Sequence, residues 1–237
     1  MTLLTLAQAA ADKIGLRRPA AIMTSTDGEV QKLLRNINEE VTDQIAAAYW
    51  QQIRTEQTFT GIAGSTQTGI LPSDFNRMVP ETFWNRSAQQ LVTAVASAVE
   101  WQNLKAISYL GIPKFVIRGS VLYMLPALAG GESLAFEYIS NNFARAASGG
   151  AAQSAFLVDG DTTVLDEPLI TLGAIWRYKM DEGLPYAADK QKYDLRRELL
   201  LGNNEPTSQI MLSADLFGGE RAYSGAPTAG ATSALYG

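Results

Sequence analysis

Three pairs of adjacent acidic residues are the groups in this sequence that could carry hydrolytic chemistry. They are Glu39 with Glu40, Asp166 with Glu167, and Asp181 with Glu182. A glycoside hydrolase places two carboxyl groups about 5 to 10 Å apart, whereas neighbouring residues of a helix point in different directions. Each pair also has a structural interpretation: a helix start at 166–167, a helix end at 181–182 and the polar face of a helix at 39–40. A carboxylate-based hydrolase is therefore the weaker hypothesis, and we expect no enzyme activity.

Other common catalytic and metal-binding residues are missing. The 237 residues include no cysteine and no histidine, which excludes disulfides, thiolate nucleophiles, the Ser-His-Asp relay and most zinc or iron sites. Asp159-Gly160-Asp161 lacks the ligand pattern and the terminal glutamate of an EF-hand calcium loop, so it predicts a hairpin turn. We expect no cofactor and no metal. Trp84, Trp101 and Trp176 are expected as core anchors rather than as a ligand platform.

The charge balance argues against a protein that reads nucleic-acid sequence. With 19 basic and 24 acidic residues the net charge is −5, which offers no global footprint for a phosphate backbone. No segment reaches the roughly 18 apolar residues that a membrane span needs, and the N-terminus lacks the basic region of a signal peptide. The sequence favours a soluble protein that keeps its N-terminal segment and binds no membrane.

The stretch from Asp166 to Leu201 predicts two helices joined by a tight turn. Asp166 is a suitable N-cap, and Pro168 fits the first helical turn. Gly183 can take the left-handed position after the first helix, and a second helix is expected over about 186–201. This second helix alternates in charge, which is typical of a solvated or partner-facing helix. The first helix carries an apolar stripe formed by Leu165, Leu169, Leu172 and Trp176.

The first fifty residues predict two more helices. One begins near Leu3 and ends at Gly15, and a longer one is capped by Thr26 or Asp27 and runs to about Trp50. Four helices from the two ends of the chain could pack as a bundle, with the middle of the chain as an insertion. The strongest helical period of the sequence lies in the longer helix, at Val30, Leu33, Leu34, Ile37, Val41, Ile45, Ala48 and Tyr49.

The middle of the chain, from about Thr55, favours short β-strands. A capping box at Ser97 and Glu100 predicts one helix among them. Residues 114–125 predict two strands around a turn at Gly119, and residues 132–140 alternate in hydrophobicity as a third strand. We expect these three strands to form a meander.

The segment after Leu201 is rich in Gly, Ser, Thr and Ala, with hydrophobic islands at 210–212 and 216–217. Such a segment builds no core of its own, but its islands can dock on another chain. The fold prediction is therefore α+β: a helical bundle formed from the N- and C-terminal helices, an inserted antiparallel β module and an extended C-terminal tail. The expected parts are 1–54 (N-terminal helices), 55–165 (inserted β-rich module), 166–203 (C-terminal helical hairpin) and 204–237 (tail).

The residues that we expect at subunit or partner interfaces lie on the C-terminal hairpin and in the tail. The competing interpretation of the hairpin cations is that they only solvate a helix. The expected interface residues are Arg177, Lys190, Arg196 and Arg197 on the hairpin, with Leu216 and Phe217 in the tail.

Several phrases of the sequence, taken in order, resemble a known family. They are Tyr49-Trp50, LPSDFNRMVPETFWN at 71–85, RGSVLYMLPALAGGESLAFEYIS at 118–140 and DEPLITLGAIWRYKMDEGLPYA at 166–187. Together they resemble the head-to-tail adaptor proteins of short-tailed bacteriophages, of the tail tubular protein A type, over roughly residues 1–203. The tail after Asn203 is not part of this resemblance.

The resemblance implies a structural protein of the virion neck, made in the cytoplasm of the host bacterium. Such adaptors form a homo-oligomeric ring, commonly a dodecamer, that joins the portal protein to the tail nozzle protein, and tail fibres are a further expected partner. Genomic DNA would pass through the lumen during ejection without sequence-specific contacts. The mild acidity of the chain suits such a lumen, because a cationic bore would hold the phosphate backbone. The alternative is another tail structural protein, or a receptor-binding virion protein that would attach to cells on its own.

Overall fold

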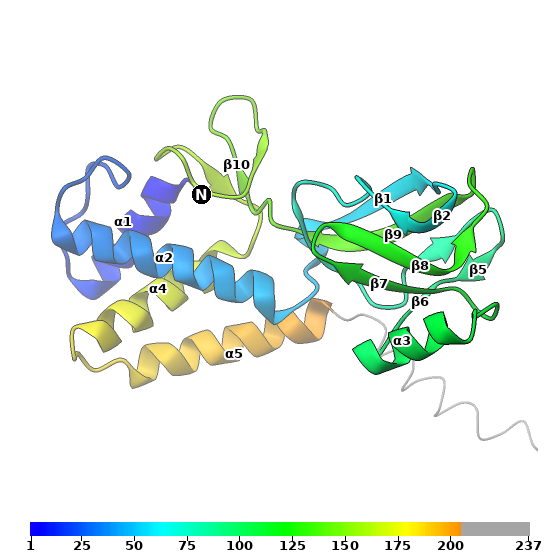
Figure 1. The fold of residues 1–237 in the computed structure, drawn as a ribbon. Coiled ribbons are helices and arrows are strands. Elements are labelled where there is room, and N and C mark those ends of the chain that lie inside the picture. The colour runs from blue at the N-terminus through cyan, green and yellow to red at the C-terminus, as the bar shows by residue number, and fades with distance from the viewer. Residues whose placement is uncertain (205–237) are drawn as a thin grey trace, which may run out of the picture.

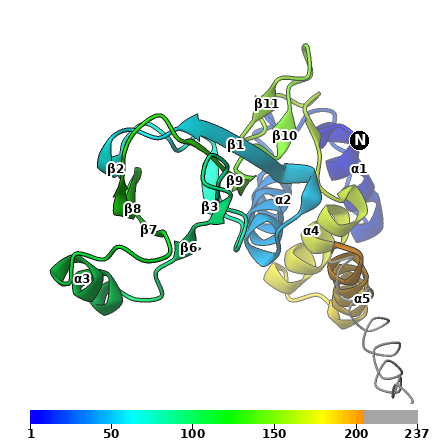
Figure 2. The same ribbon diagram turned by 90° about the vertical axis from the view of Figure 1, so that its right-hand side faces the viewer.

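The computed structural model describes residues 1–204 and has a mixed α+β fold, as the sequence predicts. Figure 1 shows a helical part and a β part side by side, and Figure 2 shows the strands of the β part curving around a common centre. The helical part is built from the two ends of the described chain. Its helices are α1 (Leu3–Ile14), α2 (Gly28–Ala47), α4 (Glu167–Asp181) and α5 (Ala187–Asn204).

Four of the predicted helix ends of this part are confirmed, whereas α2 ends at Ala47, before the predicted end near Trp50. Asp27 caps α2 and Asp166 caps α4, in each case through a side-chain oxygen that accepts a backbone N–H of the first turn. Gly15 follows α1 with φ of 85°, and Gly183 follows α4 with φ of 68°. Left-handed backbone costs a glycine little, so both glycines can turn the chain out of the helix.

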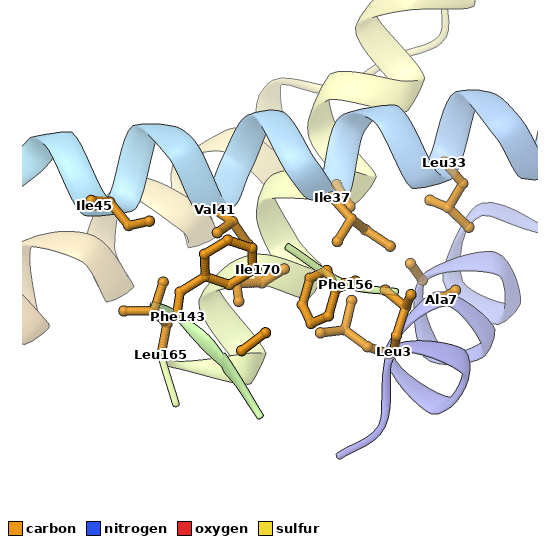
Figure 3. Packing of buried hydrophobic residues seen from close by; sticks show 14 of the residues in the cluster. Leu3, Ala7, Leu33, Ile37, Val41, Ile45, Phe143, Phe156, Leu165 and Ile170 are labelled. Atoms are coloured by element: carbon orange, nitrogen blue, oxygen red, sulfur yellow. The ribbon is translucent and has the colours of Figure 1, made fainter. Parts of the chain in front are cut away.

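Helix α4 packs against each of α1, α2 and α5. Figure 3 shows the α2 side chains of Leu33, Ile37, Val41 and Ile45 pointing from one side toward α1, α4 and the segment between the β part and α4. These four positions of the predicted α2 stripe are buried, whereas Tyr49 at its end is exposed. Each fully buried aliphatic side chain of this kind contributes about 2 kcal/mol. Phe143, Phe156 and Leu165 are also part of this core. They come from the end of the 55–165 stretch, which the sequence analysis assigned to the inserted module.

Two sheets form the β part. The chain continues from β1 of the first sheet into β2 of the second, and from β5 into β6 in the same way. The first sheet has the order β1-β9-β4-β5, with β3 also paired to β9, and the second has the order β2-β8-β7-β6. Helix α3 (Ala98–Ala106) lies between β6 and β7 in the chain. The strands are β1 (Arg54–Thr60), β2 (Gly64–Gln67), β3 (Phe75–Met78), β4 (Trp84–Asn85), β5 (Gln90–Leu91), β6 (Thr93–Ala94), β7 (Lys114–Arg118), β8 (Val121–Leu128) and β9 (Ser133–Ser140).

The predicted meander is wrong in its third strand. Strands β7 and β8 pair as a hairpin around Gly119, as expected, but β9 pairs with β1, β3 and β4 instead of β8. The turn after β8 explains the difference, because Gly130 and Gly131 both have positive φ and turn the chain into the other sheet. Local alternation therefore predicted the strand but not its neighbour.

An aromatic core lies between the two sheets. Phe83, Phe115 and Phe136 are buried there, with edge-to-face ring contacts at centroid distances of 5.1 and 5.7 Å. The tryptophan prediction holds for Trp101, a buried residue of α3, but not for Trp84, whose surface is 45% exposed on the outer face of the first sheet. Trp176 is half-buried.

A small sheet of β10 (Ala144–Arg145), β11 (Ala152–Gln153) and β12 (Thr162–Thr163) covers the helical core. The predicted hairpin at Asp159-Gly160-Asp161 is wrong, since β11 and β12 each pair with β10 and not with each other. The two carboxylates bind backbone N–H groups instead. Asp159 accepts from Ile22 and Met23, and the buried Asp161 accepts from Ala147, Leu157 and Val158. Burial alone would raise the pKa of Asp161, but these backbone hydrogen bonds lower it.

The helical part and the β part meet at a polar joint. The Arg77 guanidinium on β3 donates to the carbonyl oxygens of Ile45 and Ala48, 2.8 and 2.7 Å away, at the end of α2. Carbonyls at a helix C-terminus have no partner within the helix, so Arg77 satisfies groups that would otherwise need water. At the end of α5, Asn204 accepts from the Gln51 N–H at 3.2 Å and donates to the Tyr49 carbonyl at 3.1 Å. These bonds hold the end of α5 against Gln51, which precedes the first residue of β1 by three positions in the sequence.

Helices α2 and α4 approach closely at Gly173. A Cβ atom at this position would overlap the Glu40 carboxylate, which is fully buried between the two helices. The carboxylate is held by Arg177 and Gln44, so it has no room to move aside.

We expect Gly173→Ala to destabilise the fold by about 3 kcal/mol, because overpacking a fixed contact forces the helices apart. Gly202→Ala on α5 is the matched control, since a Cβ there meets nothing within 4 Å, and alanine in a helix is more stable than glycine by about 0.5 to 1 kcal/mol. Urea unfolding followed by circular dichroism measures both changes. Equal stability of the two variants would show that the α2–α4 contact yields easily.

Candidate assembly surface

Arg177 of α4 is largely buried and belongs to an ion-pair network, so it is not an exposed cation. Its guanidinium lies 2.9 Å from a Glu40 carboxylate oxygen and 2.7 Å from an Asp43 carboxylate oxygen. It also lies over the Trp176 ring, 4.7 Å from the centroid. The sequence predicts an interface role for Arg177, and the structure places it between α2 and α4 of the same chain.

Glu40 is the residue of this network that the sequence analysis misplaced. It was assigned to the polar face of the helix, but it is fully buried. Burial raises the pKa of Glu40, and hydrogen bonds from Gln44 and Arg177 oppose that rise. Burial likewise raises the pKa of Tyr193, and the nearby Glu40 charge adds to it. The signal was present in the spacing, because Glu40 follows Leu33 by seven residues and so falls on the apolar face.

Arg196 of α5 fixes the helical hairpin. Its Nε and Nη2 atoms each donate to an oxygen of Asp166, both at 2.7 Å. The same Asp166 carboxylate accepts the Leu169 N–H at the start of α4. A two-point guanidinium–carboxylate contact defines orientation as well as distance. Arg196 therefore holds α5 against the first turn of α4, which is a role within the chain.

The other two predicted hairpin cations lie nearer the surface. Lys190 pairs with Asp194 at 2.8 Å and lies 5.6 Å from the centroid of the Trp176 ring. Arg197 is exposed and forms no ion pair within residues 1–204. Both residues border one hollow together with Asp43, Arg177 and Tyr193. The structure thus brings Arg177, Lys190 and Arg197 together, whereas Arg196 contacts Asp166 at the start of α4.

The outer face of α5 also carries two exposed leucines that the sequence analysis did not single out. Leu195 and Leu199 are 61% and 60% exposed and lie one helical turn apart. Lys192, three residues before Leu195, has a side chain that is 67% exposed. We call Lys192, Leu195 and Leu199 the α5 outer face. Their spacing of three and four residues could have predicted this shared helix face from the sequence. The charged residues between them obscured the pattern.

The three acidic pairs each have structural partners. Asp181 lies 3.4 Å from Arg35, Glu182 lies 2.5 Å from Lys32, and Glu167 contacts the N-terminal amine. Glu39 lies 3.7 Å from Arg35. Among the described residues no group of three or more acidic side chains is arranged to hold a metal ion. Leu216 and Phe217 lie outside the described residues.

The geometry identifies only a broad class of protein. It is a mixed α+β protein in which Arg196 braces a helical hairpin and α5 exposes two leucines on its outer face. No protein-family model matches the chain. No curated protein matches it either. Within residues 1–204, none of the helices combines the length and the apolar character that crossing a bilayer requires.

Removing the Arg177 cation tests the buried network. We expect Arg177→Gln to destabilise the protein by about 3 kcal/mol at pH 7, because the Glu40 charge then stays buried without its main partner. In this variant the folded-state pKa of Glu40 lies above its unfolded value, so the penalty grows as pH rises through that range and disappears below the unfolded pKa. The loss should therefore shrink at pH 4, measured by urea unfolding at both pH values.

Lys192→Gln is the control for that measurement, because the Lys192 side chain is exposed and its removal should change stability by less than about 0.5 kcal/mol. A loss in Arg177→Gln that is the same at pH 7 and pH 4 would contradict a role for the Glu40 charge.

Proposed function

We propose that this protein is a structural subunit of a head-to-tail adaptor ring in a phage virion, joining the portal to the tail nozzle around the DNA channel. The observation that carries the proposal is the α5 outer face, where two exposed leucines lie one turn apart on a helix that Arg196 braces. Apolar side chains exposed on a rigid helix are typical of a surface that another protein covers. The ordered sequence phrases that resemble the tail tubular protein A type supply the kind of assembly.

The finer fold expectation belongs to this proposal. The four terminal helices would act as one helical bundle that forms the ring wall, and the inserted β module would face away from it. Ring closure requires a heterologous contact, in which one face of a subunit meets a different face of the next. The α5 outer face would supply one half of that contact, and Lys190 and Arg197 would form a separate charged contact on the side of α5 that borders Arg177.

The partners and location follow from the same proposal. Twelve copies would form the ring in the virion neck, with the portal protein on one side and the nozzle protein and tail fibres on the other. Leu216 and Phe217 in the C-terminal tail would engage the portal. DNA would pass through without sequence-specific contacts, and the protein would act structurally rather than as an enzyme.

The mass of the purified protein, alone and after mixing with portal rings of the same phage, tests this function. We expect ring-sized complexes in the presence of portal by native mass spectrometry. A chain ending at Asn204 should lose portal binding, because the docking islands are gone. A protein that ignores portal rings but attaches to host cells would instead be a receptor-binding virion protein.

Charge reversal separates an interface role of α5 from simple solvation. Arg197→Glu should weaken assembly on portal rings at least about tenfold, since like charges placed at an interface repel. Its stability should stay within about 0.5 kcal/mol of the wild type, because Arg197 forms no ion pair in the described chain. Arg196→Glu is unsuitable for this purpose because it breaks the contact with Asp166. Unchanged assembly of Arg197→Glu would leave only the solvated-helix interpretation.

A further inference from the structure

A hollow lies over the outer face of the first sheet, around the exposed Trp84. Its volume is about 590 Å³, which falls within the range of about 300 to 1,000 Å³ typical of small-ligand sites. Its lining comes from β1, β4 and β9 and from the turns on either side of β4. We call it the β4 hollow, and the residues that line it include Arg54, Glu56, Glu81, Trp84, Arg86 and Gln89.

Trp84 supplies the apolar surface of this hollow. Nearly half of the residue is exposed, although a large aromatic side chain usually stabilises a protein more when it is buried. Its register partner on β9 is Ala135, whose methyl group is too small to cover an indole ring. An exposed indole among polar groups suits a ligand that has both apolar and polar surface.

The two turns beside β4 each hold one residue in left-handed backbone. Glu81 has φ of 60° and Gln89 has φ of 53°, and they are two of the three non-glycine residues with positive φ within residues 1–204. Such backbone is costly for a residue with a Cβ atom, and it is concentrated at functional sites, where the surrounding structure maintains it. Both residues line the β4 hollow.

Side-chain hydroxyls tie both turns to β9. The Thr82 hydroxyl, in the turn before β4, accepts the Glu137 N–H at 3.1 Å. The Ser87 hydroxyl, in the turn after β4, accepts the Ser133 N–H at 2.9 Å. The two left-handed residues are therefore held in defined positions before any ligand arrives, which lowers the entropy cost of binding.

The charges of the hollow argue against an ionic ligand. Arg54 pairs with Glu137, and Arg86 pairs with Glu56. Two arginines and three glutamates line the hollow, which gives a net charge of −1, so a phosphate or sulfate group would meet no unpaired cation. An organic cation is usually held in a cage of several aromatic rings, whereas the hollow exposes one such ring, that of Trp84.

The polar groups that remain available match hydroxyl groups. The Glu81 carboxylate accepts hydrogen bonds, and the Gln89 amide both donates and accepts them. Within residues 1–204, neither side chain has a hydrogen-bond or ion-pair partner. A sugar ring has apolar C–H groups on its faces and hydroxyl groups around its rim. The β4 hollow offers a surface for the first and partners for the second.

We propose that the β4 hollow binds a neutral oligosaccharide. The Trp84 ring packs against the C–H groups of one sugar, and Glu81 and Gln89 bind its hydroxyl groups. The hollow is open to solvent, so further sugars can extend beyond it. The site lies within a single subunit, and its binding does not depend on the ring assembly proposed above.

Saturation-transfer NMR of the full-length protein tests this site, with a panel of neutral oligosaccharides of glucose, mannose, galactose and N-acetylglucosamine. At least one sugar should bind with a Kd of about 1 mM or lower. Trp84→Ala should raise that Kd at least about tenfold, because the apolar contact is lost. Tyr186→Ala is the matched control, since it removes an exposed aromatic side chain outside the hollow and should leave the Kd unchanged. No saturable binding by any sugar of the panel, or an equal Kd for Trp84→Ala, would overturn the proposal.

Glycine substitution separates binding from folding. The double variant Glu81→Gly, Gln89→Gly lacks both polar side chains, and glycine adopts positive φ at little cost. It should therefore unfold at the same urea concentration as the wild type or a higher one, while its Kd for the sugar rises at least about tenfold. Full sugar affinity in this variant would contradict the proposal. Saturable binding of inorganic phosphate in the hollow would do so as well, because it would show an anion site.

Discussion

The helical part depends on one buried carboxylate. Glu40 lies between α2 and α4, where Gly173 leaves room for it and Arg177 supplies the opposite charge. A charge buried without a partner is strongly destabilising, so the three residues constrain one another. Their positions set the spacing of the two helices, and with it the packing of α1 and α5, which both lie against α4. The network orients the helices more specifically than apolar contacts alone, because hydrogen bonds require defined directions.

Outside this network, carboxylates join segments that are far apart in the sequence. Asp159 binds the backbone before α2, Asp161 closes the loop that covers α1, and Asp166 joins the start of α4 to Arg196 on α5. The acidic composition of the chain is thus partly a structural requirement, since several of the acids have fixed partners within the subunit.

The sequence predicted the helices well because their signals are local. Asp27, Asp166 and Gly183 act through hydrogen bonds and backbone angles within a few residues, and they lie where capping rules place them. Strand pairing depends on distant segments. The alternation in β9 therefore predicted which side chains share a face, but it did not show that β1 is the neighbouring strand. The ion pairs of Arg177 and Arg196 were missed for the same reason, because their partners lie 137 and 30 residues away.

The joint at Asn204 determines how a mechanical load would enter the subunit. A pull on the chain beyond this residue acts first on its hydrogen bonds to Tyr49 and Gln51, close to where Arg77 holds the end of α2. The load then runs lengthwise along α5, which lies against α4 and is held to it by Arg196. A load along the axis of α5 shears its contacts with α4 together instead of peeling them apart in turn. Asn204 is therefore an anchoring point, from which tension on α5 reaches both parts of the molecule.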